Sequence, residues 1–207
     1  QGDLNLEAKE ESITDPLKSD LISKTGFVKG NKESRVGKRN GIPLQEANHG
    51  HSVLEVAEAY NFPEGEGEGQ TIGIIELGGE FVQSDLDTFF TQYKMEVPEI
   101  QLVGKPSKTP VNENIEVTAD IQVAGILAPK AKIVVYYGDS ILEAMKSALA
   151  DTKNNLSVIS ISWAGSEYGY SQAELNELNN VFYEASLKGI TVVGASGDYG
   201  AYNNKKF

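Results

Sequence analysis

The sequence predicts an α/β protein built on a parallel β-sheet, and two observations support this fold class. Hydrophobic segments of strand length are nearly continuous rather than alternating, which is typical of strands buried on both faces. Segments of helical pattern stand between them, so strands and helices alternate along the chain. With 207 residues, 40% of them hydrophobic, the chain is long enough for one ordinary domain and a tail. We therefore expect an open parallel sheet flanked by helices.

Five strands are expected, each a short apolar run bounded by glycine, proline or polar residues. They are residues 71–77, 100–103, 131–137, 156–163 and 189–195. The first run, TIGIIEL, is interrupted only by Glu76 near its end, and the fourth, LSVISISW, ends at Trp163. These runs are apolar on both faces, so we expect them to share one buried sheet.

Five helices are expected before and between these strands. They cover residues 53–60, a segment that starts near residue 84, and residues 114–127, 140–149 and 171–187. Ser52 and Ser84 are the expected N-caps of the first two helices, and Asp85 and Asp87 would interact favourably with the N-terminus of the second. Pro129 ends the third helix.

The composition excludes several classes of site. The absence of cysteine excludes disulfides, thiolate zinc sites and a cysteine nucleophile. The two histidines, His49 and His51, precede the first expected strand, which disfavours a Ser-His-Asp triad. Thirty acidic residues against 18 basic ones give a net charge of -12, which argues against a nucleic-acid partner. No apolar run is long enough to cross a membrane, so no membrane partner is expected.

Residues 1–45 read as a polar tail, and residues 46–207 as the folded part. Within the tail, residues 24–39 are rich in lysine and arginine. This basic stretch would dock on the acidic body or be cleaved near Lys38 and Arg39; the alternative is a flexible tail with no such role.

In parallel α/β sheets, functional groups collect beyond the carboxyl ends of the strands, and polar residues at such ends are therefore candidates. Glu76 ends a buried strand, where a charge must be paired or solvated in a cleft. Trp163 would line that cleft, or pack as an ordinary core residue. Asp198 lies in the small-residue segment ASGDYG, where it would contact a ligand or close a tight turn.

Glu116 and Asp120 are four residues apart on a strongly apolar helix and therefore share one face. Two carboxylates in a partly dry site cannot both ionise freely, so one pKa rises, as acid–base chemistry requires. The alternative is a solvated surface pair, which is the more common use of this spacing.

Five segments in order resemble a known family, the serine-carboxyl peptidases or sedolisins, and are most similar to its kumamolisin-like members. The segments are residues 57–65 (AEAYNFPEG), 74–79 (IIELGG), 116–132 (EVTADIQVAGILAPKAK), 160–163 (SISW) and 196–198 (SGD). Together they span roughly residues 50–200, about three quarters of the chain.

The resemblance implies a subtilisin-like α/β fold and an acid-active, secreted serine-type endopeptidase with a Ser-Glu-Asp triad. It implies that Glu116 is the general base and that Asp120 orients it. Asp198 would take the oxyanion position, donating a hydrogen bond when protonated. Glu76 and Trp163 match positions that extend the hydrogen-bond network behind the triad. A carboxylate base suits acid conditions, in which histidine would be protonated.

The sequence also departs from the family. The serine nucleophile of these enzymes lies in a Ser-Gly-Thr-Ser motif downstream, and this chain, which ends at Phe207, contains none. The family's calcium ligands and later strands are absent too, so we expect a sheet that is incomplete on its C-terminal side, with an exposed edge. Ala164 and Tyr199 stand where glycine and serine are usual. Residues 1–45 are too short for the family's full prodomain, so the resemblance implies that they are a propeptide remnant.

Three hypotheses follow. The chain is the N-terminal portion of an acid endopeptidase whose serine lies in further sequence or on a second chain that completes the domain, and it is inactive alone. Alternatively, it is a truncated, non-catalytic peptide-binding module or pseudo-peptidase. The third hypothesis is an unrelated small-molecule binder on a doubly wound sheet.

Overall fold

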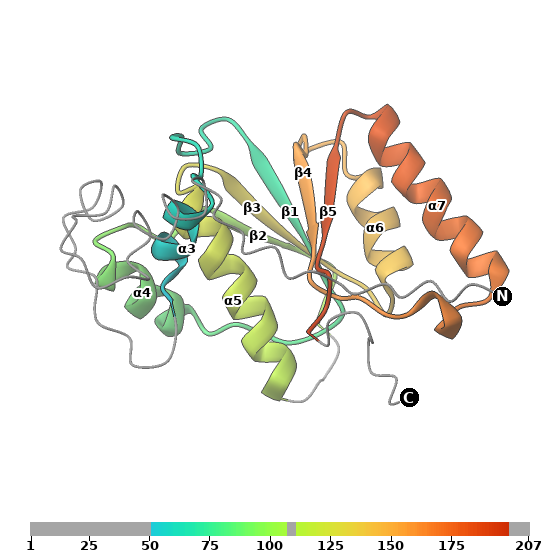
Figure 1. Cartoon of the computed structure of the whole chain (residues 1–207), viewed down its shortest axis with the longest axis horizontal. Coiled ribbons are helices and arrows are strands. Elements are labelled where there is room, and N and C mark those ends of the chain that lie inside the picture. Colours follow the sequence, from blue (N-terminus) through green and yellow to red (C-terminus); the bar gives the residue numbers. More distant parts are fainter. Residues whose placement is uncertain (1–50, 107–110, 199–207) are drawn as a thin grey trace, which may run out of the picture. The chain divides into compact units, whose positions relative to one another are not determined.

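The computed structural model describes residues 51–106 and 111–198 (Figure 1). The backbone divides into two compact units, residues 1–63 and residues 64–207. The expected tail, residues 1–45, lies outside the described residues, and so does the boundary expected after it, which remains a prediction. None of the helices in the described ranges has both the length and the hydrophobicity that a membrane span needs.

In the first unit, the described residues form helix α3 (Val53–Ala59). Ser52 is its N-cap, as the sequence predicts: its hydroxyl accepts a hydrogen bond from the Glu55 amide at 3.2 Å. The Glu55 carboxylate accepts one from the Ser52 amide at 2.7 Å. This reciprocal capping box satisfies two amides at the start of the helix.

The second unit contains a five-stranded parallel sheet, which confirms the predicted fold class. Its strands are β1 (Thr71–Glu76), β2 (Ile100–Val103), β3 (Lys132–Tyr137), β4 (Val158–Ile161) and β5 (Thr191–Gly194). The order across the sheet is β2-β3-β1-β4-β5. β1 is therefore central, paired with β3 on one side and with β4 on the other.

Helices cover both faces of this sheet (Figure 1). They are α4 (Gln83–Gln92), α5 (Val111–Leu127), α6 (Ile141–Ala150) and α7 (Gln172–Leu187). Helices α4 and α5 pack together, with α5 on β1 and β3, while α6 and α7 form the second layer. A short 3-10 helix, Glu167–Gly169, which the sequence did not predict, joins β4 to α7.

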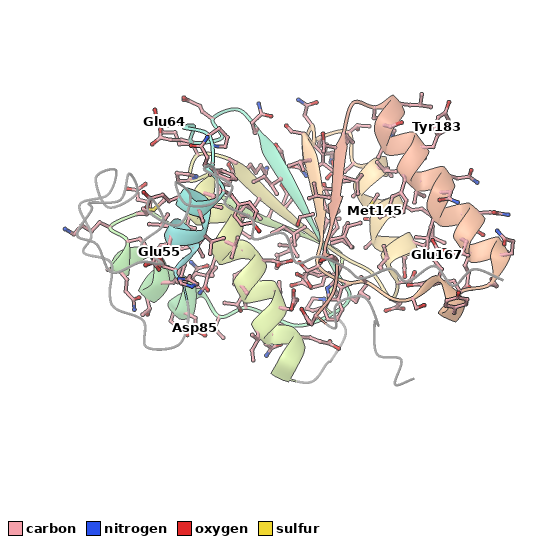
Figure 2. All side chains as sticks on the ribbon, in the orientation of Figure 1. Glu55, Glu64, Asp85, Met145, Glu167 and Tyr183 are labelled. Carbon is pink, nitrogen blue, oxygen red and sulfur yellow. The ribbon has the colours of Figure 1, made fainter. Side chains whose placement is uncertain are left out.

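The two faces of the sheet have separate cores, because successive side chains of a strand point to opposite faces. The core beneath α6 and α7 includes Ile75, Tyr136 and Ile161 from the strands and Met145 and Ala185 from the helices. Met145 lies between α6 and the sheet, whereas Tyr183 projects from the outside of α7 (Figure 2).

Several boundaries differ from the sequence prediction by one to three residues, and three of these differences follow. The N-cap of α4 is Val82, with no side-chain cap hydrogen bond, so Ser84 is not the cap: Val82 already adopts the extended conformation of a cap, and Gln83 is helical. Helix α5 begins at Val111, three residues before the expected start. Strand β4 ends at Ile161, which leaves Ser162 and Trp163 just beyond it.

The topology predicts a crevice at the carboxyl ends of two neighbouring strands. After β1 the chain passes to α4 on one face, and after β4 it passes to α7 on the other. Adjacent strands whose connections leave to opposite faces open a space between their ends, where α/β proteins bind ligands. Glu76 ends β1 at this point, and Ser162 and Trp163 follow β4.

The loop after β1 is fixed against the start of α5. Gly79 has a φ of +80°, and a Cβ atom there would collide with the carbonyl oxygen of Glu113. The next amide, of Glu80, donates a hydrogen bond to the Asn114 side-chain oxygen at 2.8 Å. This close approach requires glycine at position 79, and it positions the first turns of α5 beside the end of β1.

We predict that Gly79→Ala destabilises the protein well beyond the cost of its φ angle, because the new methyl group must displace the α5 backbone. Gly69→Ala is the matched control, since Gly69 has a φ of +74° and no atom within 4 Å of the added Cβ. The control should cost about 1–2 kcal/mol of unfolding free energy, measured by urea denaturation. Equal losses in both variants would show that Gly79 does not hold α5 in place.

Candidate functional site

Three carboxyl groups meet at the carboxyl end of the sheet. Glu76 comes from the end of β1, while Glu116 and Asp120 come from one face of α5. Val117 and Ile121, the residues next to them on the helix, are fully buried and hold α5 against the sheet. Glu116 and Asp120 consequently lie along the margin of the buried face and are half-buried.

Glu76 is 0% exposed, which is rare for a carboxyl group. Its Oε2 atom accepts a hydrogen bond from the Trp163 indole Nε1 at 2.8 Å. Burial, with smaller contributions from the nearby charges of Asp120 and Glu116, raises the pKa of Glu76 to about 8, although the Trp163 hydrogen bond opposes this. Glu76 is therefore largely protonated at neutral pH, and its proton can be donated to Asp120.

Asp120 is held by Ser162 as well. The Ser162 hydroxyl lies 2.7 Å from one carboxylate oxygen of Asp120 and 2.9 Å from the other. Burial raises the pKa of Asp120, while the hydrogen bonds from Ser162 and Glu76 partly offset that effect. Asp120 thus has two hydrogen-bond donors, Ser162 and Glu76, and is the member of the cluster best suited to carry the shared negative charge.

Glu116 is the more solvent-accessible partner. Its pKa is raised by burial first, then by the charge of Asp120 and, more weakly, by that of Asp198, while a hydrogen bond with Ser162 lowers it. Asp198, which follows β5, is exposed, and its charge reaches Glu116. The structure therefore brings the predicted pair together with Glu76, and places Asp198 within electrostatic range of Glu116.

Trp163 connects this cluster to the core on the other face of the sheet. The indole packs against the core beneath α6 and α7 while its Nε1 reaches Glu76. It also lines a pocket of about 460 Å³ formed by the segment after β4, the ends of β4 and β5, and α7. Ile161, Leu175, Leu178 and Phe182 give this pocket an apolar wall suited to an apolar group.

Sequence reasoning assigned no role to Ser162, although the segment SISW was recognised. The signal lay in the alternation of β4: Ile159 and Ile161 face the core beneath α6, so Ser160 and Ser162 belong to the face covered by α5. A hydroxyl on that face, one residue before a tryptophan, is unusual for a buried strand. Tyr137, which pairs with Glu76 in the register, was missed as well; burial and the charges of Glu76 and Glu80 raise its pKa to about 12.

The chemistry available here is proton transfer among carboxyl groups, of which Glu76 is fully buried and Glu116 and Asp120 are half-buried. Titratable groups with raised pKa values beside a pocket are characteristic of acid–base sites. In residues 51–106 and 111–198, no three side chains of the histidine, aspartate or glutamate type are arranged to hold a metal ion.

Comparisons with known proteins point to one family. The sequence is 37% identical over 167 residues to Kumamolisin from Bacillus sp. (strain MN-32). This match covers 75% of this chain and 30% of Kumamolisin. The fold matches Pseudomonas sedolisin, a serine-carboxyl proteinase complexed with two molecules of pseudo-iodotyrostatin, with a TM-score of 0.57 and 23% identity. That match covers 68% of this chain and 42% of the sedolisin chain. No family model matches the sequence. The chain spans about a third of the curated relative it matches.

Because the pKa of Glu76 is raised to about 8, stability should depend on pH. Between pH 4.5 and 8 the unfolded chain releases this proton while the folded chain keeps it, so rising pH favours unfolding. We expect the unfolding free energy to fall by up to about 1.4 kcal/mol per pH unit in this window. Glu76→Gln, which mimics the protonated acid, should flatten the dependence in urea titrations at several pH values.

The control is Glu96→Gln, a substitution at an exposed site, which should leave the slope as in the wild-type protein. If Glu76→Gln has the same slope as the wild-type protein, Glu76 is not a buried neutral acid.

Proposed function

Because the chain belongs to the sedolisin family of serine-carboxyl peptidases, we propose that it forms the N-terminal part of an acid-active endopeptidase domain. The observation that carries the proposal is the half-buried pair Glu116 and Asp120, joined to buried Glu76 at the crevice of the sheet. In this proposal peptide bonds are cleaved through a Ser-Glu-Asp triad. The serine comes from sequence outside these 207 residues, or from a second chain that completes the domain, so this chain alone is inactive.

Glu116 acts as the general base in this proposal. It is the member of the pair that solvent reaches, and its raised pKa allows it to accept a proton from a serine hydroxyl and return it to the leaving amine. Asp120 orients Glu116 and stabilises it once protonated, the part that the third group of a triad plays. Glu76, neutral and hydrogen-bonded to Trp163, supports Asp120 from behind.

Asp198 takes the oxyanion position. Its carboxyl group, when protonated in acid, can donate a hydrogen bond to the developing oxyanion of the tetrahedral intermediate. Exposure of Asp198 at the end of β5 supports this role, because the group must reach a bound peptide. Since both a carboxylate base and a protonated Asp198 are needed, activity should be confined to acid conditions.

The substrates are proposed to be peptides or proteins outside the cell. The apolar pocket beside Trp163 can accept an apolar side chain next to the cluster. The calcium ion expected for the complete family domain is proposed to take its ligands from sequence outside these 207 residues. The same pocket would serve a non-catalytic peptide-binding module, which is the alternative function.

The first test is the intact mass of the protein purified from its natural source, combined with a peptide-cleavage assay near pH 4. A longer chain, or a second one that carries a serine motif, together with cleavage, supports the peptidase. A lone 22.4 kDa species that binds peptides and does not cleave them supports the binding module instead.

In the cleaving form, Glu116→Ala and Asp120→Ala should each lower kcat by orders of magnitude while peptide binding persists, because they remove the base or its orienting group. Glu64→Ala, at an exposed loop position, is the control and should retain full activity. Near-normal rates in either alanine variant would contradict the assignment of the triad.

Asp198→Ala should mainly lower kcat, by about 100- to 1,000-fold, as expected for the loss of one oxyanion donor. Steady-state kinetics at pH 4 separate this from a binding defect, which would raise KM instead. A change in KM alone would place Asp198 in substrate binding rather than at the oxyanion.

A further inference from the structure

Ser162 contacts the carboxyl cluster of Glu76, Glu116 and Asp120 from the segment that follows β4. It follows the last residue of β4, and its hydroxyl is within 2.9 Å of both carboxylate oxygens of Asp120 on α5. The contact joins residues 42 positions apart, so it is a tertiary constraint rather than a local turn. The same hydroxyl also interacts with Glu116, one helical turn away.

A serine hydroxyl has one hydrogen to donate and two lone pairs that can accept. When that hydrogen points to Asp120, the remaining lone pairs are available to a protonated Glu116. When Asp120 is protonated instead, the hydrogen can turn to Glu116. Ser162 can therefore satisfy either charge state of the pair without movement of the backbone.

The next residue, Trp163, donates a hydrogen bond to the third carboxyl group, that of Glu76. Trp163 Nε1 donates to Glu76 at 2.8 Å, while Ser162 donates to Asp120. Two consecutive residues at the end of β4 thus hold the two carboxyl groups that share a proton. Other charged or titratable groups near the cluster are Asp198 after β5, Tyr137 at the end of β3 and Glu80 in the loop after β1.

We propose that Ser162 is a positioning residue of the carboxyl cluster: its hydroxyl fixes the orientation of Asp120 relative to Glu116 and stabilises whichever of the two is charged. The catalytic role of Glu116 and Asp120 rests on the proposed function. The contact of Ser162 with Asp120 is independent of any reaction. In both carboxyl groups, the hydrogen bond from Ser162 opposes the rise in pKa caused by burial.

The test is a titration of the Asp120 and Glu116 side-chain carboxyl carbons by NMR in the 207-residue chain. In Ser162→Ala the proton affinity of Asp120 should increase about tenfold, with a smaller increase at Glu116, because the charged form loses a donor. Ser162→Thr keeps the hydroxyl and should restore wild-type titration. If Ser162→Ala fails to fold, Ser162→Cys, a much weaker donor of similar shape, should give a smaller increase in the same direction.

Ser160→Ala is the matched control, because Ser160 lies two residues earlier on the same face of β4 and should leave both titrations unchanged. An unchanged midpoint for Asp120 in folded Ser162→Ala or Ser162→Cys overturns the proposal, as does a Ser160→Ala shift of equal size. The titration uses no substrate, so such a result leaves the peptidase proposal standing. In a cleaving form, Ser162→Ala should lower kcat and leave KM unchanged.

Discussion

The placement of one uncharged acid organises this end of the molecule. Glu76 is completely buried, and an ionised carboxylate in that position would cost several kcal/mol of hydration that the single hydrogen bond from Trp163 only partly restores. The protein resolves this by keeping the group protonated, with the Trp163 indole as donor and Asp120 as acceptor of the proton. Each of these partners belongs to a different element, so the end of β1, the segment after β4 and helix α5 are all tied to one side chain.

Packing gives this arrangement its precision. Val117 and Ile121 fix the rotation of α5 about its axis, and the contact of Gly79 with the Glu113 backbone fixes its position near β1. Because the rotation and the position of α5 are both fixed, the positions of Glu116 and Asp120 on that helix are fixed as well. A pair that would be a solvated surface feature on another helix becomes a half-buried pair whose protonation is coupled to the sheet behind it.

Local pattern predicted the parts of this structure that depend on neighbouring residues. Apolar runs predicted the strands. Ser52 was correctly predicted as an N-cap, and Glu55 completes its capping box. The prediction of Ser84 as an N-cap was wrong, because serine also occurs inside the first turn of a helix. There the Ser84 carbonyl accepts a hydrogen bond from the Thr88 hydroxyl. The resemblance to a family predicted that the acidic residues Glu76, Glu116, Asp120 and Asp198 belong to one site. Pattern could not supply the Ser162 contact, because the nearness of β4 to α5 depends on strand order rather than sequence distance.

The central position of β1 also affects how the chain acquires its structure. β1 is made before the other four described strands, yet its neighbours are β3 and β4, with Thr71 aligned to Lys132 and Ile72 to Val158. A nascent chain must therefore carry an unpaired, strongly apolar segment until the residues of β3 have been synthesised. Such long-range parallel pairing slows folding and leaves intermediates prone to association. The strand that anchors the carboxyl cluster is thus also the one most exposed to misassembly during synthesis.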